Sequence, residues 1–227
     1  ISEYNEFSDQ FFVQPLIYVY EKLFGLVSDI TLLEFSDTNS ILLKELSEKA
    51  PGTFNHSLQV ANLAEAAANE IGANSLLVRV GSLYHDIGKM KSPSYYSENQ
   101  KSNVSPHEDL TPKKSAEIII DHVSQGIFIA KKNNLPDRVI DFIRTHHGTT
   151  NVYFFLKKEI ELRGEDNVNK EDFKYPGPLP FSKETAILMM ADSVEAASKS
   201  LITPNYEKIN KFVNQLIDKQ MISGQFK

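Results

Sequence analysis

The stretch Tyr84-His85-Asp86-Ile87-Gly88-Lys89 is the part of this sequence from which its fold is best inferred. The apolar residues before it recur at helical spacing, which predicts a helix from Leu76 to about Asp86 with Ser75 as its N-terminal cap. Gly88 is expected to end that helix. An imidazole and a carboxylate are therefore neighbours in the last turn of a helix, although a single His-Asp pair is common by chance.

Helical spacing of apolar residues continues on both sides of this stretch, and strand-like alternation is hard to find. Thr53 and Ser182 are expected to cap further helices, and Pro136 is expected to start one. Residues 91–110 have no clear period and predict a loop, and loops of that length inside a compact domain are often functional. The sequence thus predicts one all-α domain, with helices over residues 11–25, 40–49, 53–71, 76–86, 111–132, 136–147, 151–163, 183–201 and from 203 onward.

The composition excludes several classes of protein. Of the 227 residues, 41% are hydrophobic and 24% are charged, which is ordinary for a soluble globular protein. The formal net charge of -6 argues against binding to polymeric nucleic acid, although a local metal site can still hold a small phosphorylated substrate. The sequence has no cysteine, so disulfides, thiolate zinc sites and cysteine nucleophiles are excluded. No apolar run approaches the roughly 18 residues of a membrane span.

Histidines and carboxylates elsewhere in the chain fall at positions suited to metal binding. His56 lies in the first turn of its expected helix, His122 lies in mid-helix, and the pair His146-His147 ends another helix. Asp192 lies between two apolar runs, where an unpaired charge would be costly. Imidazoles and carboxylates together form a nitrogen and oxygen ligand set that suits Fe, Mn, Co or Zn.

The order of these residues, a His, then His-Asp, then two later histidine positions, then Asp, resembles the HD-domain superfamily of metal-dependent phosphohydrolases. The residues around them resemble one subfamily, the intracellular HD domain of the seven-transmembrane HD receptors of the PgpH type. The resemblance covers about residues 40–201. It is carried by Leu42-Leu43-Lys44-Glu45-Leu46, Ala50-Pro51-Gly52-Thr53, His56-Ser57-Leu58, Asn62-Leu63-Ala64-Glu65, Arg79-Val80-Gly81, Tyr84-His85-Asp86-Ile87-Gly88-Lys89, Glu98-Asn99-Gln100, His146-His147-Gly148-Thr149, Tyr175-Pro176-Gly177-Pro178 and Ala191-Asp192-Ser193-Val194-Glu195-Ala196-Ala197.

The resemblance implies an all-α HD-domain helical bundle with a dinuclear metal site, in an enzyme that hydrolyses cyclic di-AMP to linear pApA. It implies that residues 40–227 form the HD phosphohydrolase domain and that residues 1–39 form a helical segment that follows a membrane region. The domain would then be the cytosolic part of a plasma-membrane protein. Whether it forms a homo-oligomer is left open.

Carried over residue by residue, the resemblance implies two divalent ions, Fe or Mn, which share Asp86. The implied ligands are His56, His85 and Asp192 for one ion, and His122 and His146 for the other. His147 would either complete the shell of the second ion or orient His146 from outside it.

Two metal ions also suit the chemistry of phosphodiester hydrolysis. The reaction needs a nucleophile and positive charge against the developing negative charge. Two ions roughly 3.5–4 Å apart supply both, since a water that bridges them becomes hydroxide near neutral pH. A bridging carboxylate, here Asp86, fixes that spacing, and in-line attack would leave the 5′-phosphate of pApA. Lys89 is the second expected catalytic residue, as a point charge on the phosphate or the leaving group, although an ordinary helix-end charge is an equal alternative.

Substrate contacts are predicted at Lys89, Tyr95, His107 and Arg144. Each has a structural alternative: Tyr95 can belong to the core, His107 can be a solvated loop residue, and Arg144 can form an ion pair.

Three other functions remain open from the sequence. The first is hydrolysis of another nucleotide, such as cyclic di-GMP, an alarmone or a nucleoside phosphate. The second is an iron-dependent oxygenase reaction on the same fold, and the third is a receiver domain that binds a cyclic dinucleotide without cleaving it. The histidines at 122 and 146 favour two ions, because a single-metal site needs only the first His, the His-Asp pair and the last Asp. A receiver would be expected to lose ligands, whereas all are present here.

Overall fold

The computed structural model describes residues 16–17, 19–21, 23–100, 105–199, 201 and 205–226. Within these residues the chain is helical, and its one β feature is an isolated bridge between Asn151 and Lys174. The α-helices are α2 (Asp29–Ser36), α3 (Ile41–Lys49), α4 (Pro51–Glu70), α5 (Ser75–Tyr84), α6 (Pro112–Lys132), α7 (Asp137–Thr145), α8 (Tyr153–Arg163), α9 (Lys183–Ser198) and α10 (Tyr206–Ile222). The prediction of an all-α fold is confirmed.

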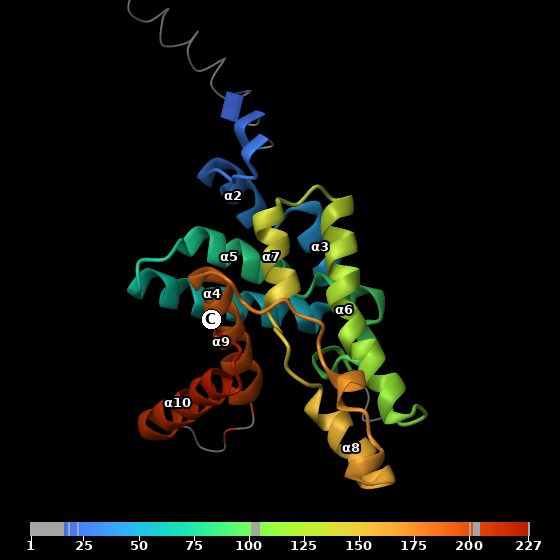
Figure 1. Cartoon of the computed structure of the whole chain (residues 1–227). Helices are drawn as coiled ribbons and strands as arrows, with labels where there is room; N and C mark the ends of the chain where they lie inside the picture. Colours follow the sequence, from blue (N-terminus) through green and yellow to red (C-terminus); the bar gives the residue numbers. More distant parts are fainter. Residues whose placement is uncertain are drawn as a thin grey trace, which may run out of the picture.

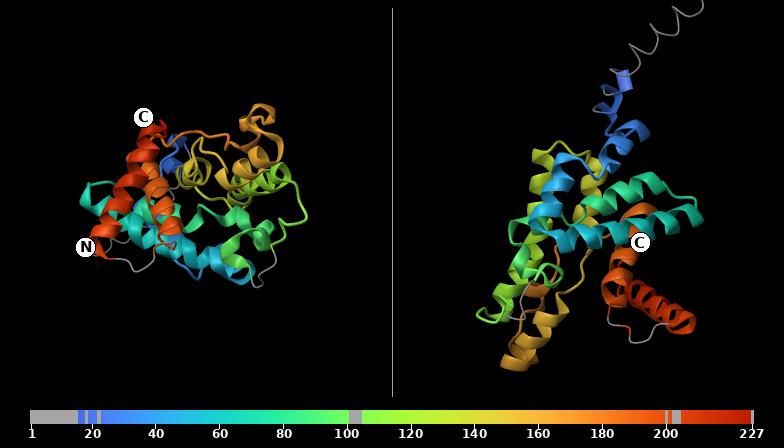
Figure 2. Two further views of the ribbon diagram at one scale, coloured as in Figure 1. Left: turned by 90° about the horizontal axis from the view of Figure 1, so that it is seen from below. Right: turned by 180° about the vertical axis from the view of Figure 1, so that it is seen from behind.

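Helices α4 and α5 form the centre of the arrangement (Figure 1). They are joined by a short turn and pack along each other, while α9 packs against α4 and α7 packs against α5. Helix α6 runs beside α7 and contacts the 3-10 segment η1 (Ile87–Lys91), which directly follows the His-Asp pair. Helix α8 lies beside the N-terminal part of α6, and α10 contacts α9 (Figures 1 and 2).

The main hydrophobic core joins α2–α7 and α9, and a smaller cluster, formed by Ala116, Phe155, Leu156 and Phe173, packs α8 against α6. Fully buried side chains enter the main core from several helices, among them Leu43, Val60, Leu83 and Ile143. Burial of each such side chain contributes about 1.5–3 kcal/mol. Leu32 of α2 belongs to the same core, so residues before position 40 pack on the domain.

Three helix starts differ from the prediction by one or two residues. Pro51 occupies the first turn of α4, where its missing N–H costs nothing, and the hydroxyl of Thr53 donates to Glu98 instead of capping the helix. Asn74, not Ser75, caps α5 through its side-chain oxygen. Pro136 immediately precedes α7 instead of lying in it.

Two predicted caps agree with the structure, whereas α5 ends at Tyr84, before His85 and Asp86, and Gly88 lies in η1 instead of ending that helix. Ser182 caps α9 with a reciprocal bond to Thr185, and Thr111 caps α6. Helix α2 was not predicted, and short 3-10 segments, η2 (Pro93–Tyr95) and η3 (Ser97–Asn99), occur where a loop was expected. The predicted helix over residues 11–25 lies partly outside the described residues.

Two glycines allow α6 to approach the His-Asp segment closely. A Cβ atom on Gly88 would overlap the carbonyl oxygen of His122, and Gly126 lies directly opposite Gly88. This contact brings the middle of α6 against the residues that follow Asp86. In the described ranges, no helix combines the length and apolar character needed to cross a bilayer.

Candidate metal centre

Three buried histidines present the same ring nitrogen to one point. The Nδ1 atom of His85 lies 2.7 Å from the carbonyl oxygen of Ser82, and the Nδ1 atoms of His122 and His146 contact the carbonyl oxygens of Ile119 and Ile143 in the same way. In each case the carbonyl belongs to the residue three positions earlier. A neutral imidazole that donates from Nδ1 has its lone pair on Nε2, so each ring offers Nε2 as a ligand atom.

Asp86 lies between two groups of these histidines and is almost completely buried. Its Oδ1 atom is 3.3 Å from Nε2 of His122 and 3.6 Å from Nε2 of His146. Its Oδ2 atom is 3.3 Å from Nε2 of His85 and 3.7 Å from Nε2 of His56. Each carboxylate oxygen therefore faces a different pair of imidazoles, which is the arrangement that a bridging ligand requires.

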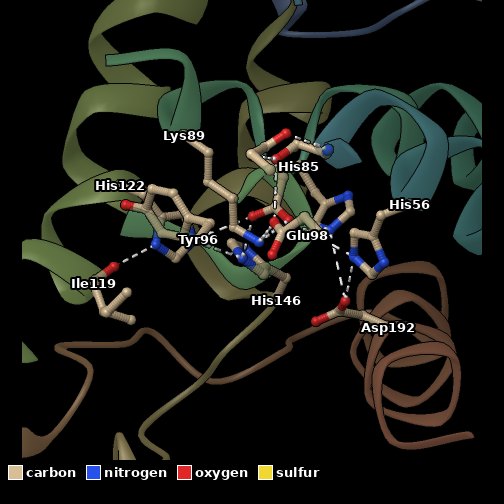
Figure 3. A network of polar contacts seen from close by, with 12 residues as sticks. His56, His85, Lys89, Tyr96, Glu98, Ile119, His122, His146 and Asp192 are labelled. Carbon is tan, nitrogen blue, oxygen red and sulfur yellow. Dashed lines mark hydrogen bonds and ion pairs between the residues drawn. The ribbon is translucent and has the colours of Figure 1, made fainter. Parts of the chain in front are cut away.

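Asp192 closes the side of the site that contains His56. Its Oδ1 atom is 2.9 Å from Nε2 of His56 and 3.7 Å from Nε2 of His85. Figure 3 shows His85 and His146 between His122 on one side and the pair of His56 and Asp192 on the other. The residues come from α4, α6, α9, the end of α5 and the end of α7, so the whole bundle contributes to the site.

The histidine nitrogens and carboxylate oxygens of the site lie close enough together to hold metal ions. Ligand atoms lie within 4.8 Å of one another in the three sets His56, His85 and Asp192; His85, Asp86 and His146; and His122, His146 and His147. Nε2 of His85 and Oδ1 of Asp86 are buried without a hydrogen-bond partner. Buried polar atoms without a partner are costly unless another group, such as a cation, satisfies them.

His147 adjoins the second histidine group but is less enclosed than its neighbours. Its ring stacks on Tyr175, with ring centroids 4.1 Å apart, and lies against His146 and His122. Burial lowers the pKa of His147 well below its usual range, and the adjacent imidazoles lower it further. The ring is therefore neutral and can act as a ligand or as an orienting group.

On the side of the site that contains His56 and His85, neighbouring carboxylates raise the pKa values of the imidazoles. Burial alone would lower the pKa of His85, but the charge of Asp86 and the contact with Asp192 outweigh it and raise that pKa to about 10. The pKa of His56 is also raised, because contacts with Asp192 and the charge of Asp86 outweigh its burial. For Asp86 and Asp192, burial is outweighed by neighbouring positive charge, which holds both pKa values well below the usual range.

These shifts predict how metal binding depends on pH. At pH 7 the metal-free site holds a proton on His85, and the raised pKa of His56 favours a proton there too, whereas Asp86 and Asp192 are already ionised. Metal must displace those protons, so affinity should rise between pH 6.5 and 8.5, by about tenfold per pH unit for each proton released. Titration calorimetry with Mn²⁺ in buffers of different ionisation enthalpy would count the protons. An affinity that is constant across this range would contradict the prediction.

Lys89 is fixed beside Asp86 by two carboxylates. Its Nζ atom is 2.7 Å from Oδ2 of Asp86 and 2.9 Å from Oε1 of Glu98, and it lies over the ring of Tyr96. Burial would lower the pKa of Lys89, but the charges of Asp86 and Glu98 raise it, so the ammonium group stays charged. Glu98 also accepts the hydroxyl of Thr53 at 3.1 Å, which ties the segment after η2 to the start of α4.

A cavity of about 620 Å³ opens onto this centre. It exposes a face of His56, Asp86, Lys89, His147 and Asp192. The remaining wall consists of Gly52, Asn55, Gln59, Ser97, Glu98, Glu195, Ala196 and Lys199. A substrate in this cavity would touch the ligand residues and Lys89 together.

The other predicted substrate contacts do not line this cavity. Nε2 of His107 is 2.9 Å from the carbonyl oxygen of Tyr95, and the His107 ring packs against Phe155. Arg144 lies 3.4 Å from Asp141 in an ion pair. The structure therefore brings the predicted metal ligands and Lys89 together and places Tyr95, His107 and Arg144 in local contacts elsewhere.

Two acidic residues of the site were not assigned a role from the sequence. Glu98 holds Lys89, and Glu195 lies 2.6 Å from Nδ1 of His56 through its Oε2 atom. The sequence spacing could have pointed to Glu195, because it follows Asp192 by three positions and so lies on the same face of α9. Glu98 lies in a segment without helical period, so its signal was the motif Glu98-Asn99-Gln100, which does not show that its carboxylate pairs with Lys89.

Fold and centre together define a helical domain with a buried cluster of histidines and aspartates that could hold metal ions. The HD domain family matches residues 53–197, and the chain belongs to that family. It is 46% identical over 211 residues to the cyclic-di-AMP phosphodiesterase PgpH of Listeria monocytogenes serotype 1/2a (strain 10403S), a match that covers 93% of this chain and 29% of the relative. It is 44% identical over 220 residues to the Bacillus subtilis (strain 168) protein of the same name, which covers 97% of this chain and 31% of the relative.

A solved structure is similar in fold as well as in sequence. The crystal structure of the L. monocytogenes phosphodiesterase PgpH HD domain in complex with cyclic-di-AMP matches with a TM-score of 0.79 and 47% identity. The match covers 84% of this chain and 88% of that one. The chain thus spans about the whole of that HD domain but only 29–31% of the length of the curated relatives.

Proposed function

We propose that this chain is a metal-dependent phosphodiesterase that hydrolyses cyclic di-AMP to linear pApA. The observation that carries the proposal is Asp86, whose two oxygens face two separate pairs of imidazoles at the base of an open cavity. The similarity to a PgpH HD domain that binds cyclic-di-AMP supports the choice of substrate.

The proposed cofactors are two divalent ions, with Fe or Mn as the expected metals. His56, His85 and Asp192 would hold one ion, His122 and His146 would hold the other, and Asp86 would contact both; His147 would complete or orient the second set. Two such ions, when bound, supply a water that is activated near neutral pH and positive charge against the phosphate oxygens. The protein's part is to fix these ligands, for example through the backbone carbonyls that hold the Nδ1 atoms of His85, His122 and His146.

Lys89 has a separate role in this proposal. Its ammonium group has three N–H donors, of which Asp86 and Glu98 take two. Lys89 also lines the cavity, so its third donor is available to a non-bridging phosphate oxygen or to the leaving 3′-oxygen. Glu98 keeps this cation in place as the phosphodiester enters.

The test is to incubate the purified domain with cyclic di-AMP and cyclic di-GMP in parallel, with Mn²⁺ or anaerobic Fe²⁺, and to separate the products by chromatography. Conversion of cyclic di-AMP to pApA is the expected result. Preferential cleavage of cyclic di-GMP would overturn the assignment of substrate but not of reaction. Failure to cleave either, with two ions bound, would favour another phosphorylated substrate or a receiver domain, and product formation that needs oxygen would favour the oxygenase alternative.

Replacement of Lys89 by methionine should lower kcat/KM for cyclic di-AMP by about 10²-fold, as does loss of one preorganised donor to a developing charge in other enzymes. Lys89→Arg should recover part of this loss because it keeps the charge. Metal content is measured on the same samples, so that a binding defect is separated from a chemical one. A Lys89→Met variant with full metal content and turnover within twofold of wild type would assign Lys89 a purely structural role.

Two expectations about context stay predictions. These are attachment to a membrane through a segment outside this chain, with the domain in the cytosol, and homo-oligomerisation. Three apolar residues of α10 lie on one stripe and are half-buried: Phe212, Leu216 and Ile217. Gln220 of the same helix donates a hydrogen bond to Ser193 of α9 at 2.7 Å.

A further inference from the structure

His56 differs from the other site histidines in what holds its Nδ1 atom. The rings of His85, His122 and His146 each contact a neutral backbone carbonyl through Nδ1. Nδ1 of His56 lies instead 2.6 Å from Oε2 of Glu195, a carboxylate whose side chain is 12% exposed. A carboxylate carries a full negative charge, so its effect on the ring is of a different kind from that of a carbonyl.

Helix α9 thus holds the His56 ring at both nitrogens. Asp192 faces Nε2 at 2.9 Å, and Glu195, three positions later, faces Nδ1 at 2.6 Å. The imidazole lies between two carboxylates of one helix, which fixes both its position and its rotation. Nδ1 donates to Glu195, so Nε2 is the atom left for a metal ion once the proton that it shares with Asp192 is displaced.

The second oxygen of Glu195 is held as well. Its Oε1 atom is 3.0 Å from Nζ of Lys199, one turn further along α9. Each oxygen of the carboxylate therefore has its own partner, and the group cannot rotate away from His56 without breaking the contact with Lys199. Both Glu195 and Lys199 line the cavity, so this ordered pair lies at the mouth of the site.

We propose that Glu195 is a positioning residue for the metal centre: it fixes the tautomer and orientation of His56 and strengthens His56 as a ligand to the ion on the His56 and Asp192 side. The inference rests on the proposed function in one respect, that His56 is a metal ligand. Outer carboxylates of this kind change metal affinity by roughly 10- to 100-fold in known sites. Glu195 touches no reacting atom in this proposal and acts only through His56.

The test is Mn²⁺ titration of the metal-stripped domain, followed by electron paramagnetic resonance, with wild type, Glu195→Ala and Glu195→Gln. Wild type should bind two ions. Glu195→Ala should weaken one of the two by about 10- to 100-fold and leave the other unchanged. Glu195→Gln keeps an oxygen acceptor for Nδ1 but loses the charge, so its affinity should fall between the two. A matched control is Glu65→Gln, which removes an ion pair with Arg79 away from the cavity and should leave both affinities unchanged.

Nitrogen NMR of His56 in the metal-free proteins adds a readout that a merely structural residue would not change. At a pH high enough for the ring to be neutral, wild type and Glu195→Gln should keep the remaining proton on Nδ1, whereas Glu195→Ala should shift it toward Nε2, which faces Asp192. Two ions bound to Glu195→Ala with wild-type affinity would overturn the positioning role while the metal centre stands. A wild-type domain that binds no Mn²⁺ or Fe²⁺ would overturn the centre itself, and the role of Glu195 with it.

Discussion

Replacement of Asp86 by asparagine should abolish hydrolysis of cyclic di-AMP, with a loss of roughly 10³-fold or more. Asparagine has almost the same shape, so the fold can accommodate it. It has only one acceptor oxygen, however, and the amide group that replaces the other would face Lys89 and His85, or else His122 and His146. The variant therefore loses the negative charge on which both groups of histidines converge, and we expect it to retain neither ion.

Asp192→Asn is the matched control for this prediction. Asp192 faces only His56 and His85, so its loss should weaken one ion and spare the other. Metal content after desalting, together with product chromatography, distinguishes the two variants. If Asp86→Asn retained two ions, or if both variants lost the same ion, Asp86 would not be the shared ligand.

The candidate ligand set could be predicted from the sequence because the order of its histidines and aspartates resembles that of HD domains. Helical periodicity added that His85, Asp86 and His146 lie at helix ends, and in the structure they directly follow α5 and α7. Asp192 stood out as a charge between apolar runs. In the structure Asp192 is buried, and its hydrogen bond with His56 offsets the cost of burying the charge.

The groups that hold the ligands could not be predicted in the same way. The contact between Glu195 and His56 joins residues 139 positions apart, and the spacing within α9 alone does not say which helix lies opposite. The segment from Lys91 to Gln100 gave no periodicity because its 3-10 turns are fixed by distant partners. Thr53, for example, donates to Glu98 and accepts from Asn99.

Competition between neighbouring residues explains a remaining difference between sequence and structure. The contact of His107 with substrate stays a prediction; here its Nε2 atom lies 2.9 Å from the carbonyl oxygen of Tyr95 and its ring packs against Phe155. Asn74 and Ser75 are both good capping residues, and propensity alone does not choose between neighbours of similar rank. Such choices depend on which side chain reaches the first free N–H groups of the helix.

The largest effect on stability is expected from Gly88→Ala, and it is not apparent from the helix-end role predicted for this glycine. A Cβ atom at position 88 would overlap the backbone carbonyl of His122 and crowd the amide of Gly126. The backbone of a packed helix cannot change rotamer as a side chain can, so α6 must shift as a whole. We expect about 1–3 kcal/mol of destabilisation from overpacking, or a fall in melting temperature of about 2–12 °C for a chain of this length. The shift also moves His122 away from Asp86, so affinity for one ion should fall.

Gly126→Ala tests the same interface from the other side. Its Cβ would meet a methyl group of Ile143 at 2.8 Å, and a side chain of that kind can move. Position 126 also lies inside α6, where alanine favours the helix over glycine by about 1 kcal/mol. The two effects oppose each other, so Gly126→Ala should be near neutral while Gly88→Ala is not. Thermal unfolding of both metal-free variants, with Mn²⁺ titration alongside, measures this difference. Equal melting temperatures would show that the contact between η1 and α6 yields easily and does not hold His122 against Asp86.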